Sequence, residues 1–155
     1  MVVFMKQKEP FIISPGFKQV DKAKTARDYL GKKVYSTSGD RVGRVKDVVY
    51  SQDRIAGLVV KGRRKLFIHK DYVQPEIVDA IILTIDPVNM LKGKLVFDSD
   101  GRKLGKVKDI ERSTTANDCD DLVVKKNIFT KPRKIPYKDV SVSKRNIILS
   151  KAYGK

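Results

Sequence analysis

The chain has 155 residues, of which 41% are apolar and 34% are charged. This apolar share excludes a disordered chain, and a single cysteine, Cys119, excludes an intrachain disulfide and is typical of a reducing cytoplasm. The 34 Lys and Arg against 18 Asp and Glu give a formal net charge of +16, which favours phosphate-rich partners such as RNA, DNA or anionic lipid.

Residues 1–27 are expected to form a leader ahead of the folded part. The apolar run over residues 1–5 is too short for the core of a signal peptide, and no run approaches the roughly 18 apolar residues of a transmembrane helix. Two prolines and a glycine before residue 21 indicate an irregular segment or an added strand. A short helix is predicted over residues 22–30, with Asp21 as its N-cap. We therefore expect a soluble, cytoplasmic protein.

Two long segments of the chain repeat each other, residues 30–48 and residues 91–110. Each holds a turn glycine followed four residues later by a second glycine, and the two sets lie 62 residues apart. A repeat of this length indicates a duplication, with a first repeat over 28–88 and a second over 89–155. Three further matches follow in the same order: Leu58–Lys61 with Leu122–Lys125, Ile68–Val73 with Ile135–Val140, and Ile81–Leu83 with Ile147–Leu149.

Each repeat is predicted to consist of short β-strands. In the first repeat, a strand over 33–36 leads into a turn where glycine supplies the positive φ of a tight hairpin. The returning strand carries apolar residues at a spacing of three, which predicts a bulge near residues 46–47 and, in the second repeat, near 108–109. Short strands with turns between them predict a mainly β protein whose sheets close into barrels. The other predicted elements of the first repeat are strands at 57–60, 65–68 and 80–84 and one helical turn within 71–78.

The repeats resemble the PRC-barrel family in three motifs. Leu30–Val34 is similar, with a slight alteration, to the family's opening pattern Leu-x-Gly-Lys-x-Val. Gly43–Val48 and Gly105–Ile110 match its central pattern Gly-x-Val-x-Asp-Val. Ile135–Val140 matches its Ile-Pro step, where the first repeat has His69 in place of proline. The resemblance covers most of the chain.

The resemblance implies two tandem small PRC-like β-barrels behind a short N-terminal leader. Family members include the cytoplasmic domain of a photosynthetic reaction-centre subunit, the C-terminal half of the ribosome-maturation factor RimM and archaeal proteins linked to cell division. These roles share docking onto a larger partner, and none is catalysis by the barrel. The resemblance gives a structural role to the repeated motif residues Gly43, Val45, Asp47, Gly105, Val107 and Asp109.

Two basic loops follow the repeated Leu-Val-Val-Lys strand, at equivalent places in the two repeats. Their Lys and Arg side chains can neutralise phosphates, and arginine adds bidentate contacts. The alternative is a solvated hairpin tip whose charges discourage edge pairing. The candidate nucleic-acid-binding residues are Lys61, Arg63, Arg64, Lys65, Lys125, Lys126, Lys131, Arg133 and Lys134.

Phe129 lies within the second basic loop and offers a ring on which a base can stack. A further basic set lies on the motif hairpins, and the alternative there is simply the outward face of each hairpin. That set is Arg41, Arg44, Lys46, Arg102, Lys103, Lys106 and Lys108.

Asp47 and Asp109 recur at a motif position that looks buried. A catalytic pair would need the two carboxylates to converge on a cleft. We expect structural carboxylates instead, which accept hydrogen bonds from backbone N–H groups at the bulge.

No metal site, cofactor or catalytic residue is predicted. Asp98–Gly101 begins like a calcium loop but lacks the later ligands, so a turn is expected. Asn117–Asp121 lacks the His or second Cys of a zinc site, so an exposed acidic loop is expected. His69 and Cys119 have no partner in a recognised nucleophile arrangement, and we expect no enzyme.

Two functions remain ahead of a third, an enzyme, which a deep pocket with converging titratable groups would support. The first is a non-enzymatic basic adaptor that binds RNA or ribonucleoprotein, with ribosome assembly as the expected setting. The second is a protein-interaction scaffold in a cell-division or membrane-associated complex, where the positive surface meets an acidic protein or an anionic membrane. RNA binding would fall steeply with salt, whereas a protein partner would survive nuclease treatment.

Overall fold

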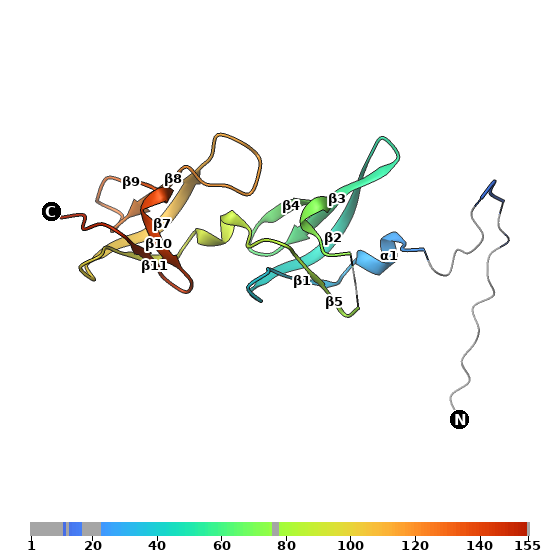
Figure 1. Ribbon diagram of the computed structural model, residues 1–155, viewed down its shortest axis with the longest axis horizontal. Helices are drawn as coiled ribbons and strands as arrows, with labels where there is room; N and C mark the ends of the chain where they lie inside the picture. Colours follow the sequence, from blue (N-terminus) through green and yellow to red (C-terminus); the bar gives the residue numbers. More distant parts are fainter. Residues whose placement is uncertain (1–10, 12, 17–22, 76–77, 155) are drawn as a thin grey trace, which may run out of the picture. The chain divides into compact units, whose positions relative to one another are not determined.

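A computed structural model describes residues 11, 13–16, 23–75 and 78–154, and these belong to two compact units (Figure 1). Of the described residues, those up to 34 and those over 43–81 belong to unit 1, and those over 35–42 and from 82 onward belong to unit 2. Most of the expected leader lies outside the described residues, and the repeat boundaries at 28 and 89 stay a prediction. Among the described residues, no helix has the length and hydropathy that crossing a membrane requires.

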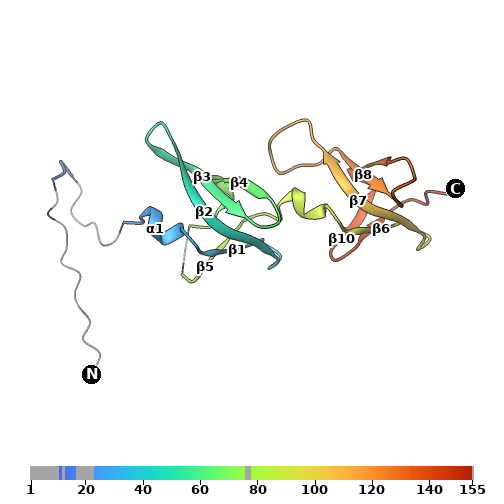
Figure 2. The ribbon, with the colours of Figure 1, turned by 180° about the vertical axis from the view of Figure 1, so that it is seen from behind.

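The first sheet has five strands in the order β4-β3-β2-β1-β5. The strands predicted in the first repeat are all present, and the last one ends two residues early. Strands β2 and β3 form the long central hairpin seen in Figures 1 and 2. The bounds are β1 (Lys33–Tyr35), β2 (Arg41–Ser51), β3 (Arg54–Lys61), β4 (Lys65–His69) and β5 (Ala80–Ile82).

The second sheet has six strands in the order β10-β11-β6-β7-β8-β9. Strands β11 and β6 pair in parallel, and the other neighbours pair antiparallel. The second half of the chain therefore repeats the hairpins of the first. The bounds are β6 (Leu95–Phe97), β7 (Lys103–Glu111), β8 (Asp121–Lys125), β9 (Arg133–Pro136), β10 (Val140–Ser143) and β11 (Ile147–Leu149).

The helical segments are shorter than predicted. The α-helix α1 covers only Ala26–Tyr29, and its N-cap is Thr25 rather than Asp21, which lies outside the described residues. Asp28 accepts a hydrogen bond from the Thr25 N–H at 2.6 Å, and Gly31 at φ +77° follows the last turn. The turn expected within 71–78 is the 3-10 helix η1. The 3-10 helices in the described part of the chain are η1 (Lys70–Tyr72), η2 (Val88–Leu91) and η3 (Tyr137–Asp139).

The expectation that each sheet closes into a barrel is wrong, because the two edge strands of each sheet are not hydrogen-bonded to each other. Within the described residues the first sheet ends at β4 and β5, and the second ends at β10 and β9. The edge strands β5 and β9 have three and four residues, so each offers few ladder bonds. Each unit is consequently a curved, open sheet that has a buried face.

The core of each unit comes from alternate residues of the long strands. In β3, Leu58 and Val60 are buried, and in β8, Leu122 and Val124 are buried. This alternation places every second side chain on one face of the sheet, and each such side chain contributes roughly 1.5–3 kcal/mol by its burial. The unit 2 core consists of Leu91, Val96, Val107, Leu122, Val124, Ile135, Ile147 and Leu149.

The two copies share the predicted bulge. The register shifts between Val45 and Asp47 in the β2–β3 pair, and between Val107 and Asp109 in the β7–β8 pair. The bulge explains the apolar spacing of three, because the extra residue restores Val48 to the buried face. The sequence prediction of two matching strand modules is confirmed at this position.

Gly43 and Gly105 have equivalent surroundings in the two units. A Cβ at Gly43 would overlap the carbonyl group of Lys61, and a Cβ at Gly105 would overlap that of Lys125. Gly105 also has φ +142°, which L side chains rarely adopt. Glycine at these positions lets β2 and β7 approach the next strand at the base of each basic loop.

Candidate nucleic-acid interface

The basic loop of unit 1 is the tip of the β3–β4 hairpin. Lys61 lies opposite Lys65, and the N–H of Gly62 closes the turn with a hydrogen bond of 3.2 Å to the carbonyl of Arg64. A turn this tight leaves no room to bury side chains, so all four predicted cations are exposed. The predicted residues Lys61, Arg63, Arg64 and Lys65 therefore lie together on one tip.

A row of like charges crosses three strands below this tip. Arg44 of β2 lies opposite Lys61 of β3, which lies opposite Lys65 of β4. Like charges directly opposite each other destabilise a sheet. An anion placed over the row would relieve this repulsion, so the row is suited to phosphate.

Unit 2 carries its basic loop at the equivalent β8–β9 connection. Lys125 lies opposite Lys106 of β7, so the pairing of two cations across neighbouring strands occurs here as well. Lys125 is half-buried, and the other predicted cations of the loop are exposed. The loop runs through Lys125, Lys126, Lys131, Arg133 and Lys134.

Lys134 differs from its predicted role because an acidic side chain pairs with it. Its ammonium lies 3.1 Å from the Glu111 carboxylate, which belongs to β7. Among the nine predicted cations, all of them in the described residues, it is the one with an ion pair. Its charge is therefore less available to an anion than that of Arg133.

The tip of the unit 2 loop is a turn that Asn127 and Thr130 close on themselves. The Asn127 side-chain oxygen accepts hydrogen bonds from the N–H groups of Phe129 at 2.9 Å and of Thr130 at 3.0 Å. The Thr130 hydroxyl accepts one from the Asn127 N–H at 3.1 Å and donates one to the Asn127 carbonyl. This turn was not predicted from the sequence, although the pattern Asn-x-x-Thr is typical of local side-chain turns.

Two apolar side chains project from this turn. Ile128 is 79% exposed and Phe129 is 90% exposed. Phe129 was predicted from the sequence as a functional residue of this loop, and Ile128 was not. A hydrophobic tip between Lys126 and Lys131 is thus part of the basic loop.

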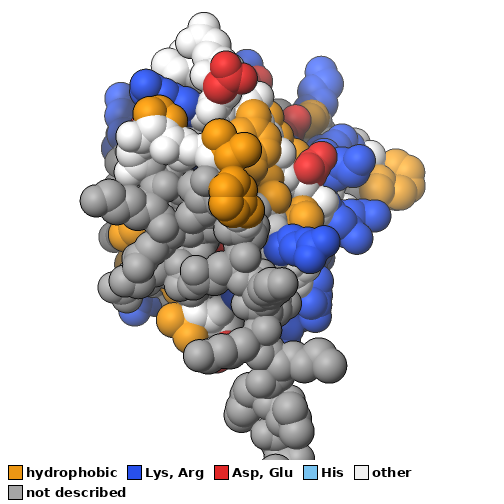
Figure 3. Space-filling view, turned by 90° about the vertical axis from the view of Figure 1, so that its right-hand side faces the viewer, with side chains coloured by type: hydrophobic (Ala, Val, Ile, Leu, Met, Phe, Trp, Pro, Cys, Tyr) orange, Lys and Arg blue, Asp and Glu red, His pale blue; other side chains and the backbone are white. Residues whose placement is uncertain are grey.

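The motif hairpins contribute further surface cations. All seven residues of the second basic set are exposed, so they do face outward, and two of them belong to the cross-strand pairings described above. Figure 3 shows Lys and Arg side chains as the larger part of the charged surface on the face in view.

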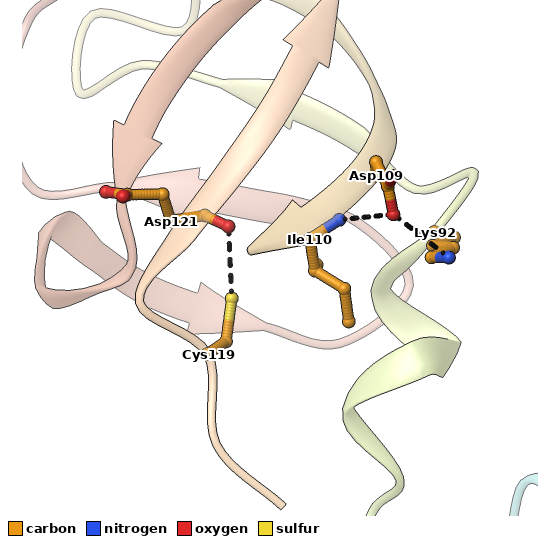
Figure 4. A network of polar contacts seen from close by, with 5 residues as sticks. All are labelled: Lys92, Asp109, Ile110, Cys119 and Asp121. Carbon is orange, nitrogen blue, oxygen red and sulfur yellow. Dashed lines mark hydrogen bonds and ion pairs between the residues drawn. The ribbon is translucent and has the colours of Figure 1, made fainter. Parts of the chain in front are cut away.

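The motif carboxylates are at the bulge as predicted, but they are exposed rather than buried. Asp47 accepts a hydrogen bond from the Val48 N–H at 2.8 Å, and Asp109 accepts one from the Ile110 N–H at 2.9 Å. Figure 4 shows Asp109 between Ile110 and Lys92, whose ammonium lies 3.0 Å away. The expectation of burial is wrong because the bulge turns this position toward solvent.

The Asp98 turn is confirmed as a structural turn. Asp98 is 2% exposed, and its Oδ1 accepts hydrogen bonds from the N–H groups of Asp100 and Arg102. Burial alone would raise the pKa of Asp98, but the N–H groups of Arg102, Tyr153 and Asp100 hold that pKa below its usual value. Ser36 has the equivalent place in the first copy, where its hydroxyl accepts from the Asp40 N–H.

A group of polar side chains around Asp139, next to the Asp98 turn, was not predicted. The Tyr153 hydroxyl donates to Asp139 at 2.5 Å, and the ammonium of Lys151 lies 3.3 Å from the same carboxylate. The hydrogen bond from Tyr153 lowers the pKa of Asp139, against the effect of burial, and Lys151 adds to the lowering. Burial and this hydrogen bond raise the pKa of Tyr153 to about 12.

The remaining candidate groups have local structural partners. His69 Nδ1 accepts a hydrogen bond from the Asp71 N–H, which caps η1. The Cys119 thiol donates a hydrogen bond to the Asp121 carbonyl at 3.3 Å (Figure 4). Burial raises the pKa of this thiol, and the negative charges of nearby aspartates raise it further. Within the described ranges, no three His, Cys, Asp or Glu side chains gather as a metal site would require.

The acidic loop is also tied to its surroundings. Asn117 accepts a hydrogen bond from the Val88 N–H at 2.7 Å, and its amide donates to the carbonyl of Asp86 at 2.9 Å. Asn117 is half-buried, whereas Asp118 and Asp120 are exposed as expected. The loop thus serves to hold the start of η2.

Comparison with known proteins supports the duplication. The family model of the PRC-barrel domain matches the chain twice, over residues 21–90 and 84–154. Among curated proteins, none matches this chain. Because the two matches together span almost the whole sequence, and the sheets, bulges and glycines repeat between the units, this chain belongs to the PRC-barrel domain family, with two copies in tandem.

Proposed function

We propose that this protein is a non-enzymatic adaptor that binds RNA or ribonucleoprotein through the basic loops of its two units, with ribosome assembly as its setting. The observation that carries the proposal is the cross-strand row Arg44, Lys61 and Lys65, which places like charges directly opposite each other. The Lys106–Lys125 pair repeats the arrangement in unit 2. A net charge of +16 adds long-range attraction for a polyanion.

The binding mode follows from the residues that are available. The loops offer ammonium and guanidinium groups to phosphates, and these contacts carry no base sequence information. Each phosphate neutralised on a single strand contributes a slope of about 0.7 to the dependence of log affinity on log salt. Three or four contacts would therefore weaken binding about 30-fold between roughly 50 and 200 mM salt.

The test is fluorescence anisotropy of labelled RNA at these two salt concentrations. The reversals Arg63→Glu with Arg64→Glu, and Lys131→Glu with Arg133→Glu, should weaken binding and flatten the salt dependence. Lys134 is left unchanged because its pairing with Glu111 would make a reversal destabilising.

The matched control reverses Lys144 and Arg145, two exposed cations in the turn between β10 and β11. It changes the net charge equally and should reduce affinity less than either loop variant. Binding that is undetectable, insensitive to salt, or weakened as much by the control variant would refute the proposal.

A second candidate function, a protein-interaction scaffold, is favoured by the outer face of unit 1. Val49 lies opposite Gly57, and Val59 lies opposite Phe67, whose side chain is 50% exposed. The equivalent positions for Val49 and Phe67 in unit 2 are Glu111 and Lys134, which pair with each other. Of the two copies, as far as the structure describes them, the first therefore presents an apolar patch at this place, of the kind that protein interfaces cover.

This candidate predicts that Phe67→Ala removes a partner. After nuclease treatment, the unaltered protein should retain one acidic protein that the Phe67→Ala variant loses, as judged by mass spectrometry of the bound fraction. Retention of the same proteins by both forms would argue against the scaffold.

A further inference from the structure

The unit 2 basic loop differs from its unit 1 counterpart by an inserted tip. In unit 1, three residues connect β3 to β4, whereas seven residues, 126–132, connect β8 to β9. The insertion is not needed to reverse the chain, because the shorter turn of unit 1 does so. The extra residues therefore call for another explanation.

The inserted tip holds its own conformation. Asn127 and Thr130 satisfy each other's polar groups with hydrogen bonds of 3.0–3.1 Å, besides a longer backbone contact of 3.4 Å. The Asn127 side-chain oxygen also accepts a hydrogen bond of 2.9 Å from the Phe129 N–H. A turn closed in this way limits the backbone freedom of the two residues between them. When these two residues become ordered on binding, they consequently lose less conformational entropy than the residues of an open loop would.

The two residues held by this turn are apolar and pack on no core. Ile128 and Phe129 are 79% and 90% exposed, and neither belongs to the hydrophobic cluster of unit 2. Lys126 precedes them and Lys131 follows them, and both are exposed. An aromatic ring is thus presented to solvent between two cations.

We infer that Phe129 is a stacking platform for a base of single-stranded RNA, whose phosphates lie on the flanking cations. This inference rests on the proposed function and specifies its substrate class. A duplex hides the faces of its bases, whereas single strands can place a base on an exposed ring. The alternative occupant of such a tip is an anionic membrane, which would use Ile128 as much as Phe129.

The experiment measures the affinity of the full chain for three probes. These are a labelled 12-nucleotide oligouridylate, a 12-base-pair RNA duplex, and vesicles that contain phosphatidylglycerol. The variants are Phe129→Ala, Phe129→Leu, Phe129→Tyr and, as the matched control on the same turn, Ile128→Ala. Circular dichroism and thermal melting check that each variant is folded.

Stacking predicts a specific pattern of affinities. Phe129→Ala and Phe129→Leu should weaken oligouridylate binding roughly 5- to 150-fold, the range for loss of one aromatic stacking contact. Phe129→Tyr keeps the ring and should stay within about twofold, as should Ile128→Ala. Duplex affinity should be unchanged by all four substitutions.

Three results would overturn the inference. Equal binding of oligouridylate by the unaltered protein and Phe129→Ala, with steep salt dependence retained, would remove the stacking contact and leave the proposed function standing. Equal weakening by Ile128→Ala and Phe129→Ala, accompanied by vesicle binding, would assign the tip to a membrane. Absence of RNA binding by the unaltered protein would refute the inference and the proposed function together.

Discussion

The burial of Tyr153 and its hydrogen bond to Asp139 make the stability of unit 2 depend on alkaline pH. The folded state raises the pKa of this tyrosine to about 12 from an ordinary value of 10. A raised pKa gives stability that is fully present below pH 10, the unfolded value, and is lost as the pH rises through the folded value near 12. The window of loss therefore lies between about pH 10 and 12.

Replacing Tyr153 with Phe should reveal this dependence. The substitution should reduce the free energy of unfolding by roughly 1–3 kcal/mol near neutral pH, because it removes a hydrogen bond to a charged group. The difference between the two proteins should shrink as the pH rises from 10 to 12. Urea denaturation at a series of pH values measures it.

Lys151 is the control, because its ammonium also pairs with Asp139. A Lys151→Met variant that still has the tyrosine should keep the alkaline loss. If that loss disappears in Lys151→Met and persists in Tyr153→Phe, the lysine and not the tyrosine is responsible.

For single residues, the sequence predicted the hydrogen-bonding role of a side chain better than its exposure to solvent. Asp47 and Asp109 were predicted as carboxylates that bond backbone N–H groups at a bulge, and they do. Their exposure was not predicted. The motif predicts that a bulge is present, but the geometry of the bulge decides the direction in which the side chain points. Tyr153 was missed because its partner Asp139 is distant from it until the sheet forms.

At the scale of elements, the hairpin β7–β8 depends on the absence of a side chain at Gly105. A Cβ there would overlap the Lys125 carbonyl, which belongs to the neighbouring strand and cannot swing away as a side chain could. Gly105→Ala should destabilise unit 2 by about 2–4 kcal/mol, since both overlap and a φ of +142° oppose alanine.

Gly101→Ala is the matched control for this prediction. Gly101 also has a positive φ, +79°, but open space surrounds the place of its Cβ. Only the backbone strain should appear there, about 1–2 kcal/mol in the free energy of unfolding. Equal destabilisation by the two substitutions would show that contact with the Lys125 carbonyl is unimportant.

The elements show where local pattern is sufficient and where it is not. The strands and the bulges follow from apolar spacing and glycines that lie within one hairpin, so they could be predicted. The helix over 22–30 was predicted too long, because Thr25 and Gly31 set its ends rather than helix propensity. The Asn127–Thr130 turn was not predicted, because the Lys and Arg residues around it led to an interpretation of the loop by its charge.

For the whole molecule, duplication was the prediction that the sequence supported best. Two family matches, two sheets and two equivalent glycine sites confirm it. Closure of the sheets was not predictable from strand count, because it depends on whether the two edge strands of one sheet meet, β4 with β5 in the first sheet and β10 with β9 in the second. The candidate interface was found from its charges, whereas the Lys134–Glu111 pair required the register of three strands.

The repeated strand Leu-Val-Val-Lys has a consequence for how the chain reaches its native state. Strand β3 and strand β8 share this segment, so during folding each can compete for the hairpin partner that belongs to the other copy. The connections differ, however: two residues, Gln52 and Asp53, join β2 to β3, whereas residues 112–120 join β7 to β8. Because the connections differ in length, each repeat has its own strand register, and exchange of strands between the two repeats is disfavoured.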